Sequence, residues 1–161
     1  MKLYHGSNVI IDQIDLSRGR RGKDFGQGFY LSPDRHQAEL MAERTVDREE
    51  FGEPTLMIYT FDEAILSNPL DLNIRIFDGY SKEWAEFILL NRRNKTYKQM
   101  HDYDIVYGPI ADDKVGLQIS RYMQQYIQMD ELIRQLSFLR PTFQFFFGTK
   151  RAIRLLHKVD E

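Results

Sequence analysis

Apolar and polar residues alternate in short runs along this chain, and strand-like and helix-like patterns are intermixed. β-branched and aromatic runs predict strands at residues 1–4, 29–31, 55–61, 72–77, 104–110 and 142–147. Apolar residues spaced three and four apart predict helices at residues 33–48, 82–91 and 115–127, and a short one from 129. Because strands and helices do not alternate regularly, we predict an α+β fold with a mixed or antiparallel sheet.

Capping and breaking residues set the expected ends of these elements. Ser32 is the predicted N-cap of the first helix, with Pro33 at its first position, and Ser81 is the predicted cap of the second helix. Gly108 and Pro109 predict an interruption of the strand at 104–110, since proline has no N–H for the ladder.

Composition narrows the class of protein. The 161 residues predict one domain, 1–161, and the net charge of −2 gives no general electrostatic case for nucleic acid or an anionic membrane. The chain has no cysteine, which excludes disulfides, thiolate metal sites and cysteine nucleophiles. Its four histidines lack the spacing of a metal site, so we expect no metal. No apolar run reaches membrane-span length and no signal-peptide core is present, so we expect a cytoplasmic protein without a membrane partner.

Two glycine-containing stretches, at residues 3–7 and 23–32, are the strongest candidates for a binding site. His5 ends a predicted strand and is followed at once by Gly6. Gly26 and Gly28, which allow unusual backbone angles or a close approach, precede the strand that contains Tyr30. A histidine and a tyrosine at the ends of neighbouring strands, each close to a glycine, can hold a flat aromatic ligand.

The segment between these stretches, residues 15–23, is basic and glycine-rich. Arg18, Arg20, Arg21 and Lys23 surround Gly19 and Gly22, which predicts a mobile loop. One interpretation is a loop whose charges are simply solvated. The other is a phosphate-contacting loop, because the arginine fork matches phosphate geometry.

The last predicted strand places one amide among phenylalanines. Strand alternation puts Phe143, Phe145 and Phe147 on one face and Gln144 with Phe146 on the other. An amide at such a position needs polar partners if it is buried. We therefore predict that Gln144 lies on the sheet face that bears Tyr30, with the three phenylalanines packed behind it.

Taken together, these stretches resemble the ADP-ribosyltransferase superfamily, and more narrowly a bacterial family assigned to it. The resemblance is found at residues 3–7, at 26–32 with the helix carrying Gln37 and Ala38, at 103–113 and at 144–152, so it covers most of the chain. It implies two small mixed or antiparallel sheets that form an NAD cleft with flanking helices. It also implies transfer of ADP-ribose from NAD to a macromolecular target, protein or nucleic acid, or hydrolysis of NAD. A role as a bacterial toxin, with an antitoxin protein as partner, follows from the resemblance alone.

The resemblance assigns roles to individual residues. His5 would bond a ribose hydroxyl, the Gly6 backbone would pair with the nicotinamide amide, and Tyr30 would stack on the nicotinamide ring. Residues 18–23 would lie over the pyrophosphate. The NAD-contacting set that it implies is Tyr4, His5, Gly6, Ser7, Arg18, Phe25, Gly28, Phe29, Tyr30 and Ser32.

The expected catalytic set, His5, Tyr30 and Gln144, departs from the superfamily at its third member. A glutamate is common there, and Gln144 can bond the ribose but has no charge. Glu86 and Asp112 are alternative carboxylates; otherwise they are a solvated helix residue and a turn former. The alternative to an enzyme is a non-catalytic NAD-binding or nucleotide-binding module, or a protein-interaction module, with the same fold.

Overall fold

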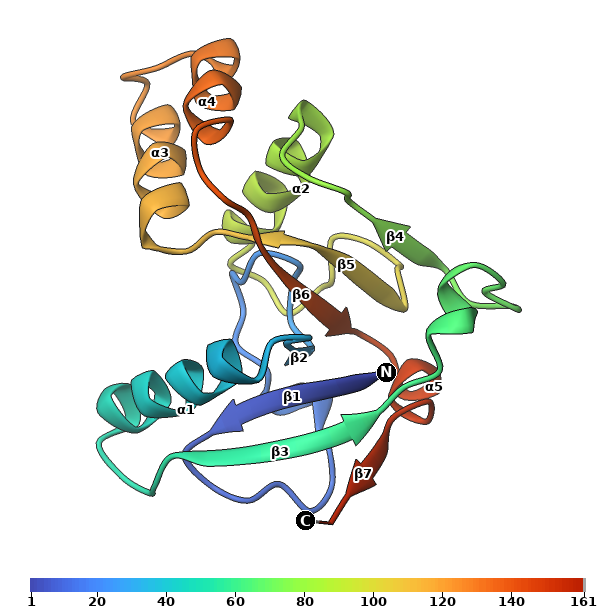
Figure 1. Ribbon diagram of the computed structural model, residues 1–161. Coiled ribbons are helices and arrows are strands. Elements are labelled where there is room, and N and C mark those ends of the chain that lie inside the picture. The colour runs from blue at the N-terminus through green and yellow to red at the C-terminus, as the bar shows by residue number, and fades with distance from the viewer. Residues whose placement is uncertain (161) are drawn as a thin grey trace.

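The computed structural model describes residues 1–160 and has an α+β architecture with two small sheets, as expected (Figure 1). The strands are β1 (Lys2–Ser7), β2 (Phe29–Leu31), β3 (Thr55–Thr60), β4 (Ile74–Ile76), β5 (Ile105–Ile110), β6 (Thr142–Phe147) and β7 (His157–Val159). The α-helices are α1 (Arg35–Glu49), α2 (Lys82–Arg92), α3 (Asp113–Met123), α4 (Met129–Leu136) and α5 (Lys150–Ile153). Short 3₁₀ turns lie at Leu16–Arg18 and Glu63–Leu66. No helix within residues 1–160 has the length and apolarity needed to cross a membrane.

The first sheet is antiparallel, with strand order β1-β3-β7, and α1 packs on its outer face (Figure 1). Gly6 makes this close packing possible, because a Cβ at that position would collide with the carbonyl oxygen of Ala38 and lie 2.7 Å from the Ala42 nitrogen. Ala38 and Ala42 are themselves buried, and their small side chains let the helix backbone approach the strand.

The second sheet is mixed, with strand order β2-β6-β5-β4. β4 and β5 are parallel, whereas the other neighbours are antiparallel. Tyr30 is registered with Phe146, and Phe29 with Phe147. Packing requires a glycine at position 28, just before β2, because a Cβ there would collide with the ring of Phe146.

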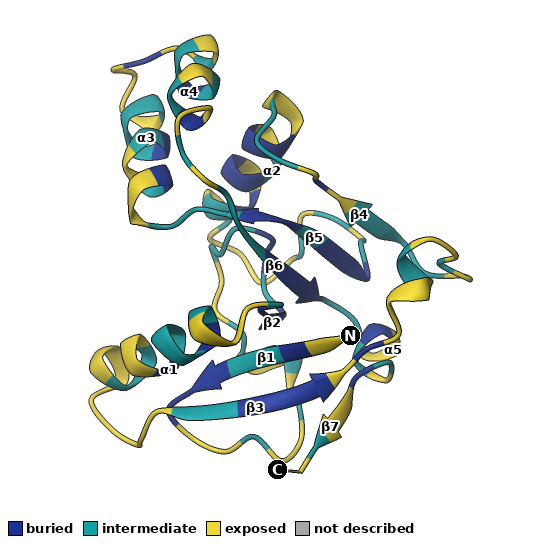
Figure 2. Cartoon of the chain, viewed as in Figure 1, coloured by how far each residue is buried: buried dark blue, intermediate teal, exposed yellow. Residues whose placement is uncertain are grey.

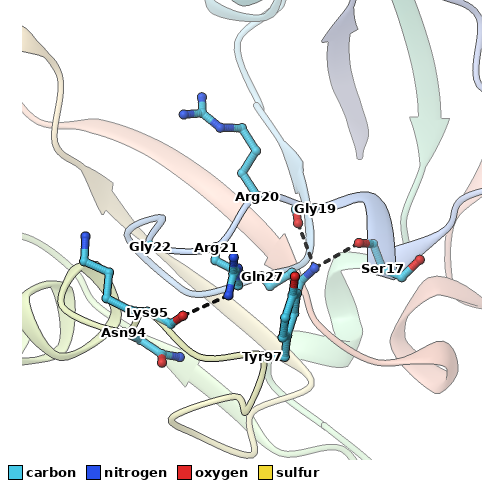
Figure 3. A pocket seen from close by; sticks show the side chains of 9 residues that line it. All are labelled: Ser17, Gly19, Arg20, Arg21, Gly22, Gln27, Asn94, Lys95 and Tyr97. Carbon is cyan, nitrogen blue, oxygen red and sulfur yellow. Dashed lines mark hydrogen bonds between the residues drawn. The ribbon is translucent and has the colours of Figure 1, made fainter.

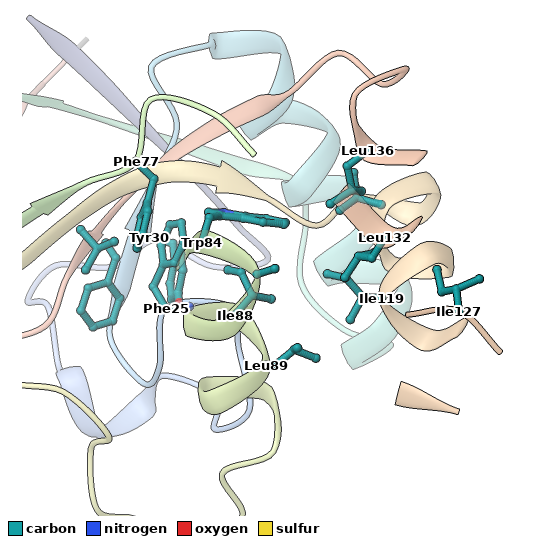
Figure 4. Close-up of a cluster of buried hydrophobic side chains, with 14 residues drawn as sticks. Phe25, Tyr30, Phe77, Trp84, Ile88, Leu89, Ile119, Ile127, Leu132 and Leu136 are labelled. Carbon is teal, nitrogen blue, oxygen red and sulfur yellow. The ribbon is translucent and has the colours of Figure 1, made fainter. Parts of the chain in front are cut away.

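Strand alternation divides the apolar side chains between two cores. Figure 2 shows where buried residues lie along the chain, and Figure 4 shows the core that contains Tyr30 and Trp84. The core between the sheets contains Leu3, Phe29, Leu31, Met57, Tyr59, Phe61, Ile105, Phe145, Phe147, Ala152 and Leu156. The core on the other face of the second sheet, beneath α2, α3 and α4, contains Phe25, Tyr30, Phe77, Trp84, Ala85, Ile88, Leu89, Val106, Val115, Ile119, Ile127, Leu132, Leu136 and Phe146. Phe29 and Tyr30 thus enter different cores, as the alternation predicts.

The two predicted helix caps have different outcomes. Ser81 caps α2 by accepting the Trp84 N–H at 3.1 Å, as predicted. The prediction for α1 is wrong, because Asp34, not Ser32, is the N-cap and accepts the His36 N–H at 2.9 Å. Ser32 instead accepts the N–H of Asp34 at 3.0 Å, which orients the residue that does the capping.

The predicted interruption at Gly108 and Pro109 is also wrong, because β5 runs through both residues to Ile110. The N–H and C=O of alternate β5 residues face β4, and Tyr107 accepts the Phe77 N–H on that side. Pro109 faces the same side, but β4 ends at Ile76, opposite Tyr107. The missing N–H of Pro109 therefore leaves no ladder partner unsatisfied, and its carbonyl accepts the indole N–H of Trp84 at 2.7 Å.

Candidate functional site

The two sheets meet where β1 and β2 touch and then diverge. Tyr4 and Ser32 exchange both backbone hydrogen bonds, each 2.8 Å long, and form an isolated bridge. Continued antiparallel pairing would bring Gly6 opposite Tyr30, but within residues 1–160 no second bridge follows. Because backbone directions repeat every two residues, the N–H and C=O of Gly6 point toward β2, as those of Tyr4 do. We call the place where β1 and β2 part, with the Gly6 backbone on the β1 side, the notch.

His5 fixes the spacing of this notch. Its Nδ1 lies 2.6 Å from the carbonyl oxygen of Tyr30, and its ring stacks on Phe29 with centroids 4.2 Å apart. Burial lowers the pKa of His5 to about 4, outweighing the opposite effect of the bond to Tyr30, and the charge of Lys23 lowers it further. The imidazole is therefore neutral near pH 7, with its proton on Nδ1 because the partner is a carbonyl. Nε2 keeps a lone pair that accepts a hydrogen bond.

The Tyr30 side chain is held on the far side of β2. Its hydroxyl donates to the carbonyl of Gly26 at 2.6 Å and accepts the Phe25 N–H at 3.0 Å. Phe146 packs against the ring at 69°, with centroids 5.4 Å apart. Burial raises the tyrosine pKa well above 10, so the hydroxyl stays protonated. Gly26 supports this loop with a φ of +97°, a conformation that favours glycine, as the sequence indicated.

Lys23 covers the Tyr30 ring. Its Nζ lies 3.9 Å from the ring centroid, and within residues 1–160 no carboxylate or carbonyl oxygen accepts a bond from it. Burial lowers the Lys23 pKa to about 8; the charge of Asp24 opposes this shift, whereas Arg20 and Arg48 add to it. The ammonium is therefore held mainly by the aromatic ring.

Gln144 lies on the same sheet face as Tyr30, as predicted. It is registered with Gly108, two residues from Phe146, whose partner is Tyr30. Gln144 as a whole is 9% exposed. Within residues 1–160 its amide has no hydrogen-bond partner, yet neither amide atom is sealed from solvent. A nearly buried amide whose donor and acceptor are unused, and which solvent can still reach, is suited to bind a polar ligand. Phe145 and Phe147 are buried behind it, and Phe143 is half-buried.

Arg20 and Arg21 of the basic loop face a separate hollow of about 430 Å³ (Figure 3). It is lined by Ser17, Gly19, Arg20, Arg21, Gly22, Gln27, Asn94, Lys95 and Tyr97. Arg21 stacks over Tyr97, 4.0 Å from its centroid, and donates to the Lys95 carbonyl at 2.8 Å. The Gln27 amide donates to the carbonyls of Ser17 and Gly19 at 3.0 and 2.8 Å. The loop is thus tied on both sides; Lys23 covers the Tyr30 ring, whereas Arg20 and Arg21 line this hollow.

Several residues of the expected NAD-contacting set have structural roles. Phe25 has no exposed surface and belongs to the core with Trp84, which corrects the expectation that its side chain contacts NAD. Ser7 is buried and accepts the Val9 N–H at 3.4 Å, and Ser32 is buried beneath the start of α1. Arg18, in contrast, is exposed.

The two alternative carboxylates have contacts of their own. Glu86 lies on the exposed face of α2, 3.9 Å from Lys82. Asp112 is the N-cap of α3 and accepts the Val115 N–H at 3.0 Å. Each thus has the helix-surface or turn-forming role considered for it from the sequence.

Two supporting residues were not recognised from the sequence. Asp24 accepts from Arg92 at 2.7 Å and from the Ala111 N–H at 2.8 Å, which ties the loop to α2 and to the end of β5. His101 donates to the Phe25 carbonyl at 2.7 Å and accepts the Tyr103 N–H at 3.1 Å. Both ring nitrogens of His101 therefore have partners in the fold.

Comparison with known proteins adds a family but no activity. No curated protein matches the chain, and neither does any solved structure. One family model, described as "Protein of unknown function (DUF3990)", matches residues 1–158. Since that match spans almost the whole sequence, the chain belongs to the DUF3990 family.

Proposed function

We propose that this protein binds NAD in the notch between β1 and β2 and transfers ADP-ribose to a macromolecular acceptor, within an ADP-ribosyltransferase-like fold. The observation that carries the proposal is the divergence of these strands at Gly6 and Tyr30, with His5 fixed between them. Three stretches far apart in the sequence, His5-Gly6, Phe29-Tyr30 and Gln144-Phe146, contact one another or share one register there.

The chemistry of the notch suits the nicotinamide ribose half of NAD. A carboxamide has one acceptor oxygen and an NH₂ donor, and the Gly6 backbone offers the complementary N–H and C=O. The neutral His5 ring has Nε2 ready to accept from a ribose hydroxyl. These contacts are directional, so they would orient the bond between the ribose and the nicotinamide ring.

In the proposed transfer the bond from ribose C1′ to the nicotinamide nitrogen breaks, and nicotinamide leaves with the electron pair. A nucleophile of the acceptor then bonds to C1′ and loses its proton to solvent. The Gln144 amide oxygen is a dipole and not a full charge, so it orients the ribose while stabilising the developing cation less than a carboxylate does. We therefore expect slow turnover, or turnover that depends on the acceptor.

Gln144 also favours a second candidate, a non-catalytic NAD-binding or nucleotide-binding module. Both carboxylates considered for the acidic role have contacts on α2 and α3. This candidate predicts NAD binding without release of nicotinamide.

Titration calorimetry with NAD tests binding, and chromatographic measurement of nicotinamide tests turnover. His5→Ala should weaken NAD binding about fivefold, since one hydrogen bond and its orienting effect are worth roughly 1 kcal/mol. His36→Ala, on the exposed face of α1, is the matched control and should leave affinity unchanged. Equal affinity of wild type and a folded His5→Ala protein would refute the assignment of the notch. Mass spectrometry of lysate incubated with labelled NAD would identify the acceptor.

A further inference from the structure

The Tyr30 ring face is occupied by a cation from the same chain. Lys23 and Tyr30 are seven residues apart, and Nζ lies 3.9 Å from the ring centroid. The tyrosine cannot turn away, because its hydroxyl is anchored at Gly26 and Phe25. The lysine is the movable partner, since the aromatic ring is its contact and no oxygen of residues 1–160 accepts from its ammonium.

Resting on the proposed function, we propose that Lys23 is a gatekeeper that holds the aromatic face meant for the cationic nicotinamide ring and must leave before NAD binds. An ammonium and a pyridinium ring are both attracted to the π face of tyrosine, so they compete for one surface. They also repel each other, which prevents simultaneous binding.

The surroundings of Lys23 make its departure inexpensive. Its pKa is lowered to about 8 because the charged amine is desolvated, so its return to water recovers solvation. Arg20 and Arg48 lie near enough to disfavour its charge, with Asp24 as the opposing group. Gly22, with a φ of +70°, precedes Lys23 and permits backbone angles that other residues avoid. The loop can therefore release the lysine while Arg21 keeps its contacts with Lys95 and Tyr97.

The gate predicts a specific effect of removing the amine. While Lys23 covers the Tyr30 ring, the protein cannot bind NAD. The apparent affinity for NAD is therefore the affinity of the open protein multiplied by the fraction of protein that is open. A cation–π contact at a partly desolvated site corresponds to about a fivefold change. Lys23→Gln should therefore bind NAD about fivefold more tightly, whereas Lys114→Gln on α3, with the same change of charge, should match wild type.

Carbon-13 labelling of the lysine ε carbon supplies a readout that needs no activity. The Lys23 ε protons should be shifted upfield by the Tyr30 ring current, with Lys23→Gln identifying the signal, and saturation with NAD should remove that shift. NAD binding that leaves the upfield signal in place, or weaker binding by Lys23→Gln, would overturn the gate while the proposed NAD site stands. Failure of both proteins to bind NAD would overturn the gate and the proposed function together.

Discussion

His5 and Tyr30 are joined through the imidazole of one and the backbone of the other, with Nδ1 2.6 Å from the carbonyl oxygen. The carbonyl that would otherwise continue the β1–β2 ladder is thus occupied by a side chain. Burial keeps this imidazole neutral: its pKa is about 4 in the folded protein, although the bond to Tyr30 opposes the shift, and near 6.5 in the unfolded chain.

Burial of the His5 ring makes stability depend on pH. Because the folded pKa lies below the unfolded one, the unfolded chain takes up the proton first, and stability is lost as pH falls from about 6.5 toward 4. We expect wild type to lose about 2 kcal/mol more between pH 7 and pH 5 than His5→Gln, measured by urea unfolding. A parallel pH dependence in the two proteins would contradict this prediction.

Gly6 is required by the packing of α1 on β1. In Gly6→Ala the new methyl would collide with the Ala38 carbonyl, which belongs to helix backbone and cannot rotate aside. We expect a loss of at least ~3 kcal/mol in urea unfolding. The control is Gly116→Ala within α3, where the added Cβ would meet no other part of residues 1–160 within 4 Å beyond its own helix backbone. That substitution should stabilise the protein by about 1 kcal/mol through helix propensity.

Asp104, just before β5, and Arg151 in α5 form an ion pair in which the carboxylate is buried and the guanidinium is half-exposed. The guanidinium donates to both carboxylate oxygens, at 2.8 and 2.6 Å, and Asp104 is 1% exposed. Burial raises the Asp104 pKa, but the bonds from Arg151, Thr149 and Asn73 outweigh burial and lower it. Arg151→Gln should lower the midpoint of urea unfolding, because it leaves the buried Asp104 carboxylate without its charged partner. Asp104→Asn should lower the free energy of unfolding less in the Arg151→Gln protein than in wild type. Additive losses in this double-mutant cycle would refute the coupling of the two side chains.

Local signals explain which parts of the fold were predictable. The Ser81 cap, the strand at 142–147 and the face of Gln144 each depend on residues within one helical turn or one strand. The cap of α1 was mispredicted because Ser32 and Asp34 are both good capping residues two positions apart, and local chemistry does not rank them.

Contacts between distant segments account for what was missed. Asp24 accepts from Arg92, which lies 68 residues further along the chain. His101 bonds the carbonyl of Phe25, which lies 76 residues before it. The position of Lys23 over the Tyr30 ring could not be predicted for the same reason. In the sequence Lys23 is one basic residue among several, but Lys23 contacts Tyr30, whereas Arg20 and Arg21 line the hollow. Alternation sets the face of a side chain, but only the assembled fold sets its partner.

Gln144 decides between an enzyme and a binding module. Its amide has no hydrogen-bond partner among residues 1–160 and reaches solvent from a nearly buried position, on the face shared with Tyr30. Gln144→Glu would place a negative charge where the ribose cation is proposed to develop. We expect NAD turnover, measured as nicotinamide release, to rise about tenfold, which corresponds to ~1.4 kcal/mol of added transition-state stabilisation.

Further substitutions test whether the change in turnover depends on position 144 itself. Gln144→Ala should reduce turnover to background while retaining part of the NAD affinity, because the Gly6 and His5 contacts remain. Gln128→Glu, an exposed position at the start of α4, introduces the same charge away from the site and should leave turnover unchanged. If Gln144→Ala is as active as wild type and Glu86→Ala or Asp112→Ala is inactive, the acidic role belongs to that carboxylate. If none of these proteins releases nicotinamide although all bind NAD, the binding module is the correct interpretation, because a catalytic ribose site would respond to a charge placed beside it.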